Sequence, residues 1–319
     1  MAITVQHLSK VFQTKKKKEG VWNSIKSLVS PQYEDVHAVQ DVSFNIEPGD
    51  VVGFIGPNGA GKSTTIKMLT GILWPTEGDI DVLGYDPQRE REQLANHIGT
   101  VFGQRQQLWL HLPPLDSYEL FKHVYGVPEQ AFNDRLERLI DLFEIRGFVD
   151  QPVRKLSLGQ RMRCEFVASL LHNPELLFLD EPTIGIDSVT KKKIRRHIKR
   201  LNEEHNTTII LTSHDFDDIE ALCDRVIIIN DGEILYDDTT KALKQRITKK
   251  TVKITFTEAT KATSLPFNAE QDNPYEAHTT VDTEETSVAD ILRALPETGV
   301  EDISVTEPDI DSIIETYFE

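Results

Sequence analysis

The sequence has 319 residues, of which 39% are hydrophobic and 27% are charged, and its formal net charge at pH 7 is -17. A soluble chain of this length is expected to form one large domain and one smaller domain. The acidic balance argues against nucleic acid as the main partner, because that kind of binding uses Lys and Arg to neutralise phosphates.

The N-terminal segment, residues 1–12, reads as a strand, and no signal-peptide pattern precedes it. We interpret residues 13–36 as a basic, amphipathic insertion. It starts with Lys15-Lys16-Lys17-Lys18, and its apolar residues then fall on one face of a short helix: Val21, Trp22, Ile25, Leu28 and Val29. Two interpretations stay open: this face rests on a membrane surface or a membrane protein, or it packs against its own domain.

The middle of the chain alternates between strand and helix patterns. Apolar patterns predict strands of an α/β core at 36–46, 51–55, 79–83 and 98–102, and a helix at 64–69. Helical spacing then takes over, which predicts a helical subdomain inserted at about 105–170, as in Phe132, Leu136, Leu139, Ile140 and Phe143. Strands resume at 176–181, 207–212 and 226–229, and Asp231-Gly232 predicts a hairpin turn into 233–236. These apolar runs are far shorter than the roughly 20 residues that cross a bilayer, so the chain is not expected to span a membrane.

The composition changes after about residue 245, where acidic residues greatly outnumber basic ones. The pattern predicts a strand at 252–256, a helix at 288–295, a strand at 303–305 and a terminal amphipathic helix at 310–318. We therefore predict a small, acidic α/β domain at 246–319. A regulatory role, a role in dimerisation and no role beyond solubility all stay open for it.

The segment Gly56-Pro57-Asn58-Gly59-Ala60-Gly61-Lys62-Ser63-Thr64 matches the phosphate-binding pattern G-x-x-x-x-G-K-[ST], between an apolar strand and a helix. Its glycines allow the backbone to curl until N–H groups point at a phosphate chain, and the helix adds the partial positive charge of its N-terminus. Lys62 is predicted to reach the outer phosphates and the Ser63 hydroxyl to bind magnesium. The alternative, a turn that binds nothing, is disfavoured by the register of Lys62 and Ser63.

Asp180-Glu181 follows four apolar residues, which describes a buried strand that ends in two carboxylates beside the phosphates. One carboxylate can hold magnesium, directly or through water, and the other can polarise the attacking water. An ordinary acidic strand end is the alternative. The preceding phosphate loop and the Pro182-Thr183 that follows favour the functional interpretation.

The segment Leu156-Ser157-Leu158-Gly159-Gln160, here named the signature segment, precedes a helical run at 161–171. Ser157 is placed to cap that helix, and the exposed N–H groups with the Gly159 backbone form a second anion site. A single nucleotide does not need two phosphate sites. We therefore predict that two chains meet head to tail, each presenting this segment to the nucleotide of the other.

The series of motifs resembles that of the ATP-binding cassette (ABC) ATPases over roughly residues 1–240. The series comprises the phosphate loop, Gln104 after a strand, the signature segment, Asp180-Glu181, Gly185-Ile186-Asp187 and a strand that ends in Thr212-Ser213-His214-Asp215. The signature segment has Leu158 where the family more often has glycine. The resemblance implies an ABC ATP-binding domain at 1–245, with a P-loop NTPase (RecA-like) α/β core, an antiparallel β subdomain and the inserted helical subdomain.

The resemblance also implies roles for individual residues. Glu181 would be the general base, His214 would hydrogen-bond the γ-phosphate, and Gln104 would touch magnesium and the attacking water. Asp180 and Ser63 would complete the magnesium site. The other implied nucleotide contacts are Gly56, Asn58, Gly59, Gly61, Lys62 and Thr64 in the phosphate loop, Ser157, Gly159 and Gln160 on the partner's γ-phosphate, and Asp187 at the dimer contact. For the aromatic residue that stacks on adenine, Phe12 and Tyr33 stay open as alternatives.

Within this family, a single cassette with an acidic C-terminal extension resembles the ATPase subunits of bacterial ABC-2-type exporters. This implies ATP and Mg²⁺ as ligands, separately encoded integral membrane permease subunits as partners, and a peripheral position at the cytoplasmic face of the cell membrane. A second ATPase subunit is also implied, with a homodimer favoured over a heterodimer. The permease is expected to contact the surface near 104–118, where Leu108, Trp109 and Leu110 either add apolar area or are buried in the helical subdomain.

Two further observations bear on location and on alternative functions. The two cysteines, Cys164 and Cys223, have neither metal-ligand spacing nor the density of a disulfide scaffold, which indicates a reducing, cytosolic location. The alternative function is a soluble ABC-type ATPase, or an ATP-gated regulatory module, that acts on a cytosolic partner. A P-loop kinase would leave the signature segment unexplained.

Overall fold

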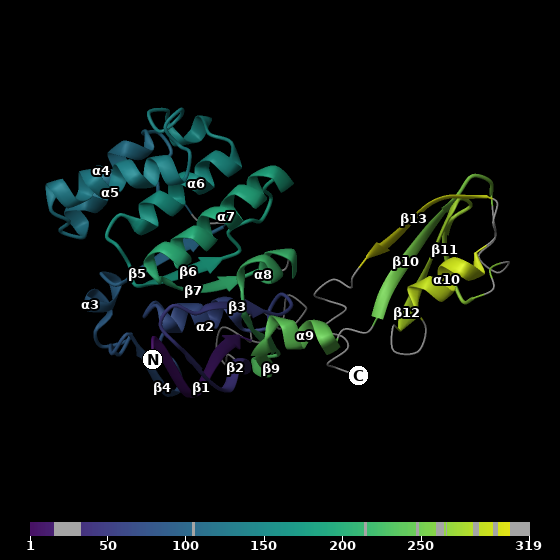
Figure 1. Ribbon diagram of the computed structural model, residues 1–319. Coiled ribbons are helices and arrows are strands. Elements are labelled where there is room, and N and C mark those ends of the chain that lie inside the picture. Colours follow the sequence, from purple (N-terminus) through teal and green to yellow (C-terminus); the bar gives the residue numbers. More distant parts are fainter. Residues whose placement is uncertain are drawn as a thin grey trace, which may run out of the picture. The chain divides into compact units, whose positions relative to one another are not determined.

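The computed structural model describes residues 1–15, 33–103, 106–213, 216–246, 249–259, 265, 267–282, 287–295 and 299–306. The chain divides into two compact units, Met1–Thr240 and Lys241–Glu319 (Figure 1). No described helix is long and apolar enough to cross a membrane.

The first unit is built on a six-stranded sheet. Its strands lie in the order β5 (Ile98–Phe102), β6 (Leu176–Asp180), β7 (Thr208–Thr212), β3 (Val51–Ile55), β8 (Arg225–Asn230) and β9 (Glu233–Thr239). All neighbours are parallel except β8 and β9. The hairpin turn between these two was predicted correctly: Asp231 and Gly232 both have positive φ, 45° and 84°, as a type I′ turn requires.

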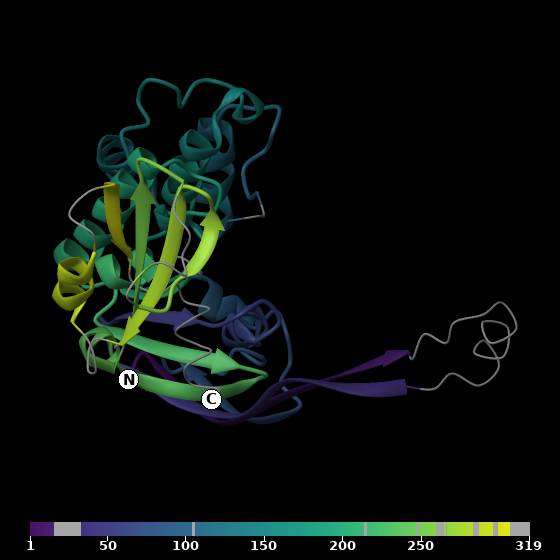
Figure 2. The ribbon, with the colours of Figure 1, turned by 90° about the vertical axis from the view of Figure 1, so that its right-hand side faces the viewer.

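A second, antiparallel sheet lies in the same unit, in the order β2 (Tyr33–Ile46), β1 (Ile3–Lys15) and β4 (Glu77–Val82). Strands β1 and β2 extend further than the sequence suggested, because their pairing continues to Lys15 opposite Tyr33. They therefore form a two-stranded arm that enters the segment we interpreted as an insertion (Figure 2). The amphipathic helix predicted at 21–29 lies outside the described residues.

A group of helices occupies the region between β5 and β6, at the top of Figure 1: α4 (Pro114–Val124), α5 (Glu129–Leu142), η1 (Val153–Lys155) and α6 (Leu158–Leu170). The predicted helical spacing places Phe132, Leu139 and Ile140 in the interior. The rings of Phe143 and Phe166 stack there with their centroids 5.4 Å apart. The remaining described helices of the unit are α2 (Lys62–Leu69), α3 (Arg91–Ala95), α7 (Ser188–His205) and α8 (Phe216–Leu222), and α9 (Thr240–Arg246) begins at the unit's last residue.

The second unit contains a four-stranded antiparallel sheet. Its strands lie in the order β11 (Glu270–Asn273), β12 (Glu276–Asp282), β10 (Lys249–Phe256) and β13 (Val300–Thr306). Helix α10 (Val288–Ala294) contributes Ile291 to a small core with Val252, Ile254 and Phe256. The strands at β10 and β13 and the helix were predicted, whereas β11 and β12 were not. The predicted terminal helix lies outside the described residues.

Candidate nucleotide-binding site

The phosphate loop connects β3 to α2, and its glycines are fixed by close backbone contacts. Gly61 has φ of 108°, and a Cβ atom there would lie 2.5 Å from the carbonyl oxygen of Ala38 in β2. A Cβ atom on Gly56 would lie 2.0 Å from the carbonyl oxygen of Ile229 in β8. No side chain caps the N-terminus of α2, so its positive end is directed at the loop and favours an anion there.

Lys62, the first residue of α2, is buried and turns back into the loop. Its Nζ donates hydrogen bonds to the carbonyl oxygens of Gly56, at 2.5 Å, and Pro57, at 2.9 Å. These carbonyls hold the ammonium group in the concave side of the loop. The position suits a charge that moves onto a phosphate when one is bound.

The carboxyl ends of four neighbouring strands meet beside this loop. Phe102 pairs with Asp180, Asp180 with Thr212, and Thr212 with Phe54. The Thr212 hydroxyl donates to Asp180 Oδ1 at 2.7 Å, and the Ser63 hydroxyl donates to Asp180 Oδ2 at 3.4 Å. A cavity of about 240 Å³ opens here, lined by Asn58, Ser63, Lys67, Ile72, Phe102, Asp180 and Glu181.

Glu181 has an uncommon backbone conformation for a residue with a side chain, with φ of 54°. Its N–H donates to the carbonyl oxygen of Thr212 at 3.1 Å and to the Thr212 hydroxyl at 3.0 Å. Such strain persists only where the surroundings fix it, and it is common at active sites. Glu181 lines the phosphate cavity at this turn.

The signature segment leads into α6, and Ser157 caps that helix as predicted. The Ser157 hydroxyl accepts from the Gln160 N–H at 3.2 Å, and the Ser157 N–H donates to Gln160 Oε1 at 2.8 Å. Gly159 packs so closely on α7 that a Cβ atom would lie 2.7 Å from Thr190 Cγ2. The described lining of the phosphate cavity includes none of these residues.

The comparisons with known proteins agree with this geometry. A family model described as ABC transporter matches residues 39–184. The chain is 35% identical over 208 residues to the ABC transporter ATP-binding protein NatA of Bacillus subtilis (strain 168), a match that covers 65% of this chain and 84% of NatA. The chain belongs to the ABC transporter family. It is the ATP-binding subunit of an ABC transporter and an ABC-type ATPase.

Two further similarities support the assignment of this chain to the ABC ATPases. It is 31% identical over 250 residues to the bacitracin transport ATP-binding protein BcrA of Bacillus licheniformis, covering 78% of this chain and 80% of BcrA. It is also similar to a dimeric, post-hydrolysis structure of the ATP-binding cassette MJ0796 bound to ADP and Pi. That match has a TM-score of 0.61 and 26% identity, and covers 74% of this chain and 98% of the cassette. The P-loop fold predicted from sequence is confirmed.

The donor set of the phosphate cavity also suits Mg²⁺. This ion prefers hard oxygen ligands, and the Ser63 hydroxyl and the Asp180 carboxylate lie together at the cavity wall. These two residues would hold the ion, and its charge would neutralise phosphate oxygens. Gln104, the third predicted ligand, and His214 lie outside the described residues. They follow, in the chain, the ends of β5 and β7, the strands on either side of β6.

Of the two candidates for adenine stacking, Phe12 lies nearer to the phosphate loop along the arm than Tyr33 does. Ala38 in β2 touches the phosphate loop at Gly61. Phe12 lies opposite Val36, two residues from Ala38, whereas Tyr33 lies five residues away. At about 3.4 Å per residue these separations are roughly 7 Å and 17 Å along the arm. Phe12 is also partly exposed, with the Lys10 ammonium 5.2 Å from its ring centroid.

Asp187, the predicted dimer contact, caps helix α7. Its carboxylate accepts from the N–H groups of Val189 at 3.1 Å and Thr190 at 3.0 Å. Hydrogen bonds from Thr190 are the main reason that the pKa of Asp187 is lowered. The residue therefore carries a fixed negative charge at the start of the helix on which Gly159 packs.

Three residues to which sequence analysis assigned no role organise the ABC site. Thr212 holds both Asp180 and Glu181, as described above. Asp218 in α8 is fully buried and accepts from the hydroxyls of Thr183 and Ser213, the latter at 3.1 Å. It also pairs with Arg195 Nε of α7 at 2.5 Å. No sequence pattern marks Asp218, since its partners lie far apart in the chain.

Glu165 of α6 is the third such residue. It is buried, and its carboxylate accepts from the N–H of Gln107, at 3.2 Å from each oxygen, and from the N–H of Leu108 at 3.4 Å. Burial raises the pKa of Glu165 to about 7, and the two N–H groups oppose that rise. The signal in the sequence was one charged residue inside the otherwise uncharged, mostly apolar run 164–171, which is buried in the structure.

Proposed function

We propose that this ABC ATPase dimerises around two Mg-ATP molecules and drives export through separately encoded, ABC-2-like permease subunits at the cytoplasmic face of the cell membrane. A homodimer is favoured, because one chain carries every motif that two equal sites need. The domain boundaries at 245 and the individual site roles given above are part of this proposal.

The observation that carries the proposal is the division of the site. The phosphate cavity is lined by the loop and by Asp180 and Glu181, whereas the capped N-terminus of α6 presents Ser157 and Gly159 elsewhere on the same chain. A second chain, arranged head to tail, would bring the missing anion contacts to the γ-phosphate. The dimeric MJ0796 cassette with ADP and Pi supports this arrangement.

Hydrolysis then follows from the placement of Glu181. Its carboxylate takes a proton from a water molecule as the water oxygen bonds to the γ-phosphorus. The bond from that phosphorus to the β–γ bridging oxygen breaks, and its electron pair leaves with ADP. Lys62 and the helix α2 N-terminus stabilise the phosphate charge, and His214 would hydrogen-bond the γ-phosphate. The loss of the γ-phosphate removes the group that joins the two chains.

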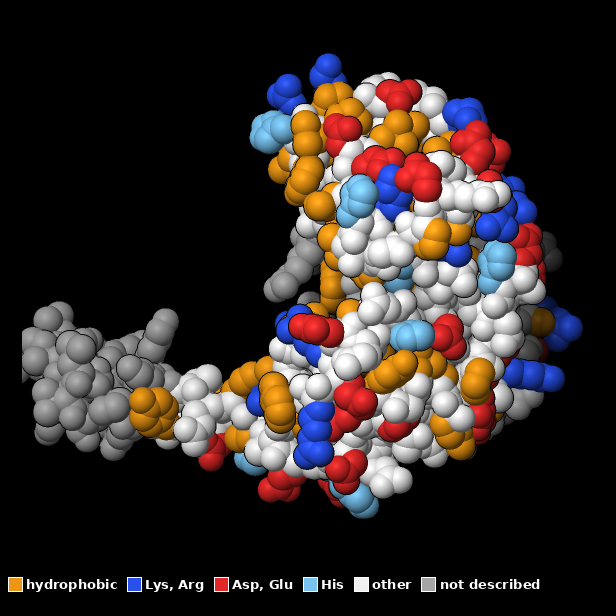
Figure 3. Space-filling view, turned by 90° about the vertical axis from the view of Figure 1, so that its left-hand side faces the viewer, with side chains coloured by type: hydrophobic (Ala, Val, Ile, Leu, Met, Phe, Trp, Pro, Cys, Tyr) orange, Lys and Arg blue, Asp and Glu red, His pale blue; other side chains and the backbone are white. Residues whose placement is uncertain are grey.

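The helical subdomain carries exposed apolar side chains that suit a membrane partner. Figure 3 shows the face that lies on the left in Figure 1, and hydrophobic side chains gather over the upper, helical part of this face. Those with large exposed fractions in this region are Trp109, Leu110, Leu112, Leu120 and Val124, whereas Leu108 is buried. Of the two alternatives for these residues, Leu108 is therefore buried in the helical subdomain, whereas Trp109 and Leu110 remain available to a permease.

The same segment is bonded directly to the turn before the signature segment. The N–H of Val153 donates to the carbonyl oxygen of Leu112 at 3.0 Å, and the N–H of Arg154 to that of Leu110 at 2.9 Å. Glu165 fixes the backbone just upstream, at Gln107 and Leu108. A permease that moves residues 107–112 would therefore also move the signature segment.

The decisive experiment is co-purification of the tagged full-length chain from gently solubilised membranes, with ATP turnover measured before and after. A multispanning protein that co-purifies and changes the turnover rate supports the transporter. Leu120→Asp/Val124→Asp should lose that partner and keep basal turnover, whereas Leu292→Asp, an exposed apolar position in the C-terminal unit, should keep both. A chain that stays alone and hydrolyses ATP would indicate a soluble ABC-type ATPase with a cytosolic partner.

A further inference from the structure

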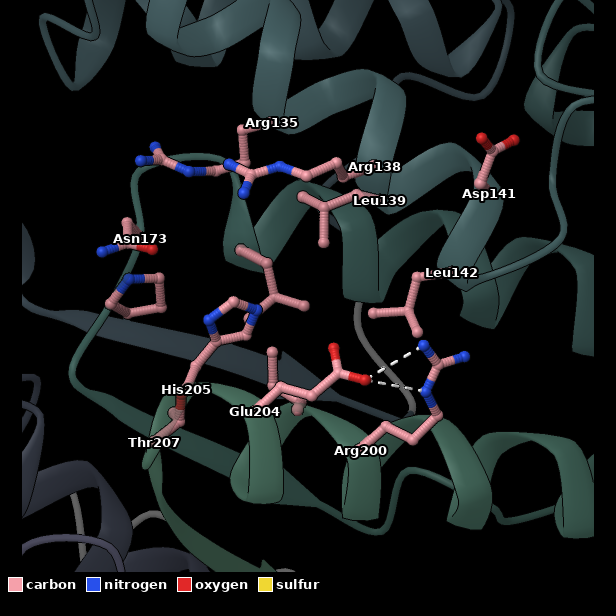
Figure 4. Close-up of a pocket in the computed structure, with 13 residues that line it drawn as sticks. Arg135, Arg138, Leu139, Asp141, Leu142, Asn173, Arg200, Glu204, His205 and Thr207 are labelled. Carbon is pink, nitrogen blue, oxygen red and sulfur yellow. Dashed lines mark hydrogen bonds and ion pairs between the residues drawn. The ribbon is translucent and has the colours of Figure 1, made fainter.

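A second cavity lies in the first unit, at the edge of the sheet where β6 and β7 begin. Its volume is about 450 Å³, and its walls come from α5, from the end of α6 with the loop that follows, and from the C-terminal half of α7 (Figure 4). It shares no lining residue with the phosphate cavity, which opens where these strands end. None of the functions above uses it.

The buried part of the cavity lining is mostly apolar. The buried residues that line it are Leu139, Leu170, Pro174, Leu201 and Thr207. Polar side chains stand around them, with Arg135 and Arg138 on one wall and His205 and Asn173 facing them (Figure 4). An apolar interior with a few polar groups is typical of small-molecule sites, and the volume lies in their usual range of about 300–1,000 Å³.

The charges of the lining do not balance. Arg200 pairs with Glu204 at 3.0 Å, and Asp141 is engaged by Arg146 at 2.7 Å. Each of the two acidic groups in the lining therefore pairs with another arginine. Arg135 and Arg138 have no carboxylate partner among the described residues. Arg135 donates to the carbonyl oxygen of Leu171 at 2.6 Å, and Arg138 to that of Asp134 at 3.2 Å.

The two guanidinium groups also act on each other. The pKa of Arg135 is lowered, first by partial burial and then by the positive charge of Arg138. Two like charges held together favour an anion between them, and guanidinium groups bind phosphate, sulfonate or carboxylate groups through paired N–H donors. In a chain with a net charge of -17, such a local excess of positive charge does not follow from composition.

We propose that this cavity binds a small organic anion, with its phosphate, sulfonate or carboxylate group on Arg135 and Arg138 and its apolar body against Leu139, Leu170 and Leu201. The ligand would contact α5 of the helical subdomain and α7 of the core at once. It would therefore hold these two elements together without touching bound ATP.

The test uses two fluorescent probes that differ only in the anionic group: 8-anilino-1-naphthalenesulfonate and the uncharged N-phenyl-1-naphthylamine. Both are titrated against the full chain with Mg-ADP at saturation, so that the nucleotide site is filled. We expect Arg135→Gln/Arg138→Gln to weaken binding of the sulfonate at least tenfold and to leave the uncharged probe unchanged. Lys192→Gln/Lys199→Gln, which removes two exposed charges from α7 outside the cavity, should bind both probes like the wild type.

The single variant Arg138→Gln is a control for folding, because the only hydrogen bond described for Arg138 is within its own helix. It should weaken binding of the sulfonate about threefold to fivefold, on the scale of one ordinary hydrogen bond, because Arg135 still holds the anion. Equal sulfonate affinity in the wild type and both arginine variants would overturn the proposal. Displacement of the probe by Mg-ADP, or equal loss of the uncharged probe, would also overturn it.

Discussion

Replacing Asp218 by asparagine should weaken both the fold and the catalysis of this ABC ATPase. The buried carboxylate joins Thr183, two residues after Glu181, to Ser213, the residue before His214. Through Arg195 it also joins both to α7, which Asp187 caps. Asp218 does not line the phosphate cavity, so we describe it as a positioning residue for the segments that carry the proposed catalytic groups.

The structure sets the magnitude of the loss. Asparagine keeps the shape of the side chain but removes its charge and one acceptor oxygen, so one of the hydroxyls or Arg195 loses a carboxylate partner. Breaking a buried ion pair costs about 3–5 kcal/mol. The Arg195 side chain is 18% exposed and keeps a neutral acceptor, which reduces the expected loss to about 2–3 kcal/mol. At roughly 2–4 °C per kcal/mol for a unit of this size, Tm should fall by about 4–12 °C.

The kinetic effect should fall on kcat. No described contact of the Asp218 carboxylate is with the phosphate loop, so KM for ATP should change less than about threefold. A shift of the Glu181 and His214 segments that costs about 1.4–2.8 kcal/mol in the transition state lowers kcat about 10-fold to 100-fold. Asp217→Asn, which removes one charge at an exposed position of the same helix, is the matched control.

The assay is steady-state ATP turnover at a temperature where both variants are folded, together with thermal unfolding. A wild-type kcat in Asp218→Asn would refute the positioning role, even if Tm fell. A wild-type Tm would show that the buried charge contributes nothing to stability.

Three further predictions concern single residues. His197 is buried with neither ring nitrogen hydrogen-bonded among the described residues, and burial lowers its pKa from 6.5 to about 4. The unfolded chain binds this proton more tightly than the folded chain does. The free energy of unfolding should therefore fall as pH drops from 6.5 towards 4, by up to about 3 kcal/mol. His197→Leu should lack this part of the pH dependence when unfolding is measured in denaturant. Gly103→Ala would place a Cβ atom 2.2 Å from the Glu181 carbonyl oxygen, so turnover should fall about tenfold or more. Glu181→Gln should keep ATP binding, nearly abolish turnover and accumulate an ATP-bound dimer in light scattering.

Each of these predictions has a clear contrary outcome. An identical pH dependence of unfolding in the wild type and His197→Leu would remove His197 as its source. Gly147→Ala is the control for Gly103→Ala, because a Cβ atom there meets nothing within 4 Å; equal turnover in the two variants would show that the Glu181 backbone tolerates displacement. Normal turnover in Glu181→Gln would exclude Glu181 as the general base.

The sequence predicted the parallel strands well because each is a short, continuous apolar run between polar segments. The strand at 98–102 was predicted with the bounds that the structure shows. Strand β11 was missed for the opposite reason: Glu270, Gln271, Asp272 and Asn273 are polar and exposed, and they pair only because β12 lies beside them. Backbone pairing of this kind leaves no periodic signal.

The motifs of the site could be located from sequence, but not the residues that hold them in place. The phosphate loop and Asp180-Glu181 follow local rules, since a strand and a loop fix their positions. Asp218 depends on Thr183, which is 35 residues away in the chain, and on Arg195, 23 residues away. Only the folded sheet brings these together, so no spacing rule could have found them.

The segment after β5 shows how such unpredicted contacts bear on function. The side chain of Gln107 in this segment donates to the carbonyl oxygen of Thr100 in the sheet at 2.5 Å. The backbone N–H of the same residue donates to the Glu165 carboxylate of α6. One residue is therefore attached both to the core and to the helix that follows the signature segment. Any movement between the helical subdomain and the core therefore strains one of these two hydrogen bonds. A shift of the helix that follows the signature segment is thereby coupled, through Glu165 and Gln107, to strand β5, which pairs with the strand that ends in Asp180.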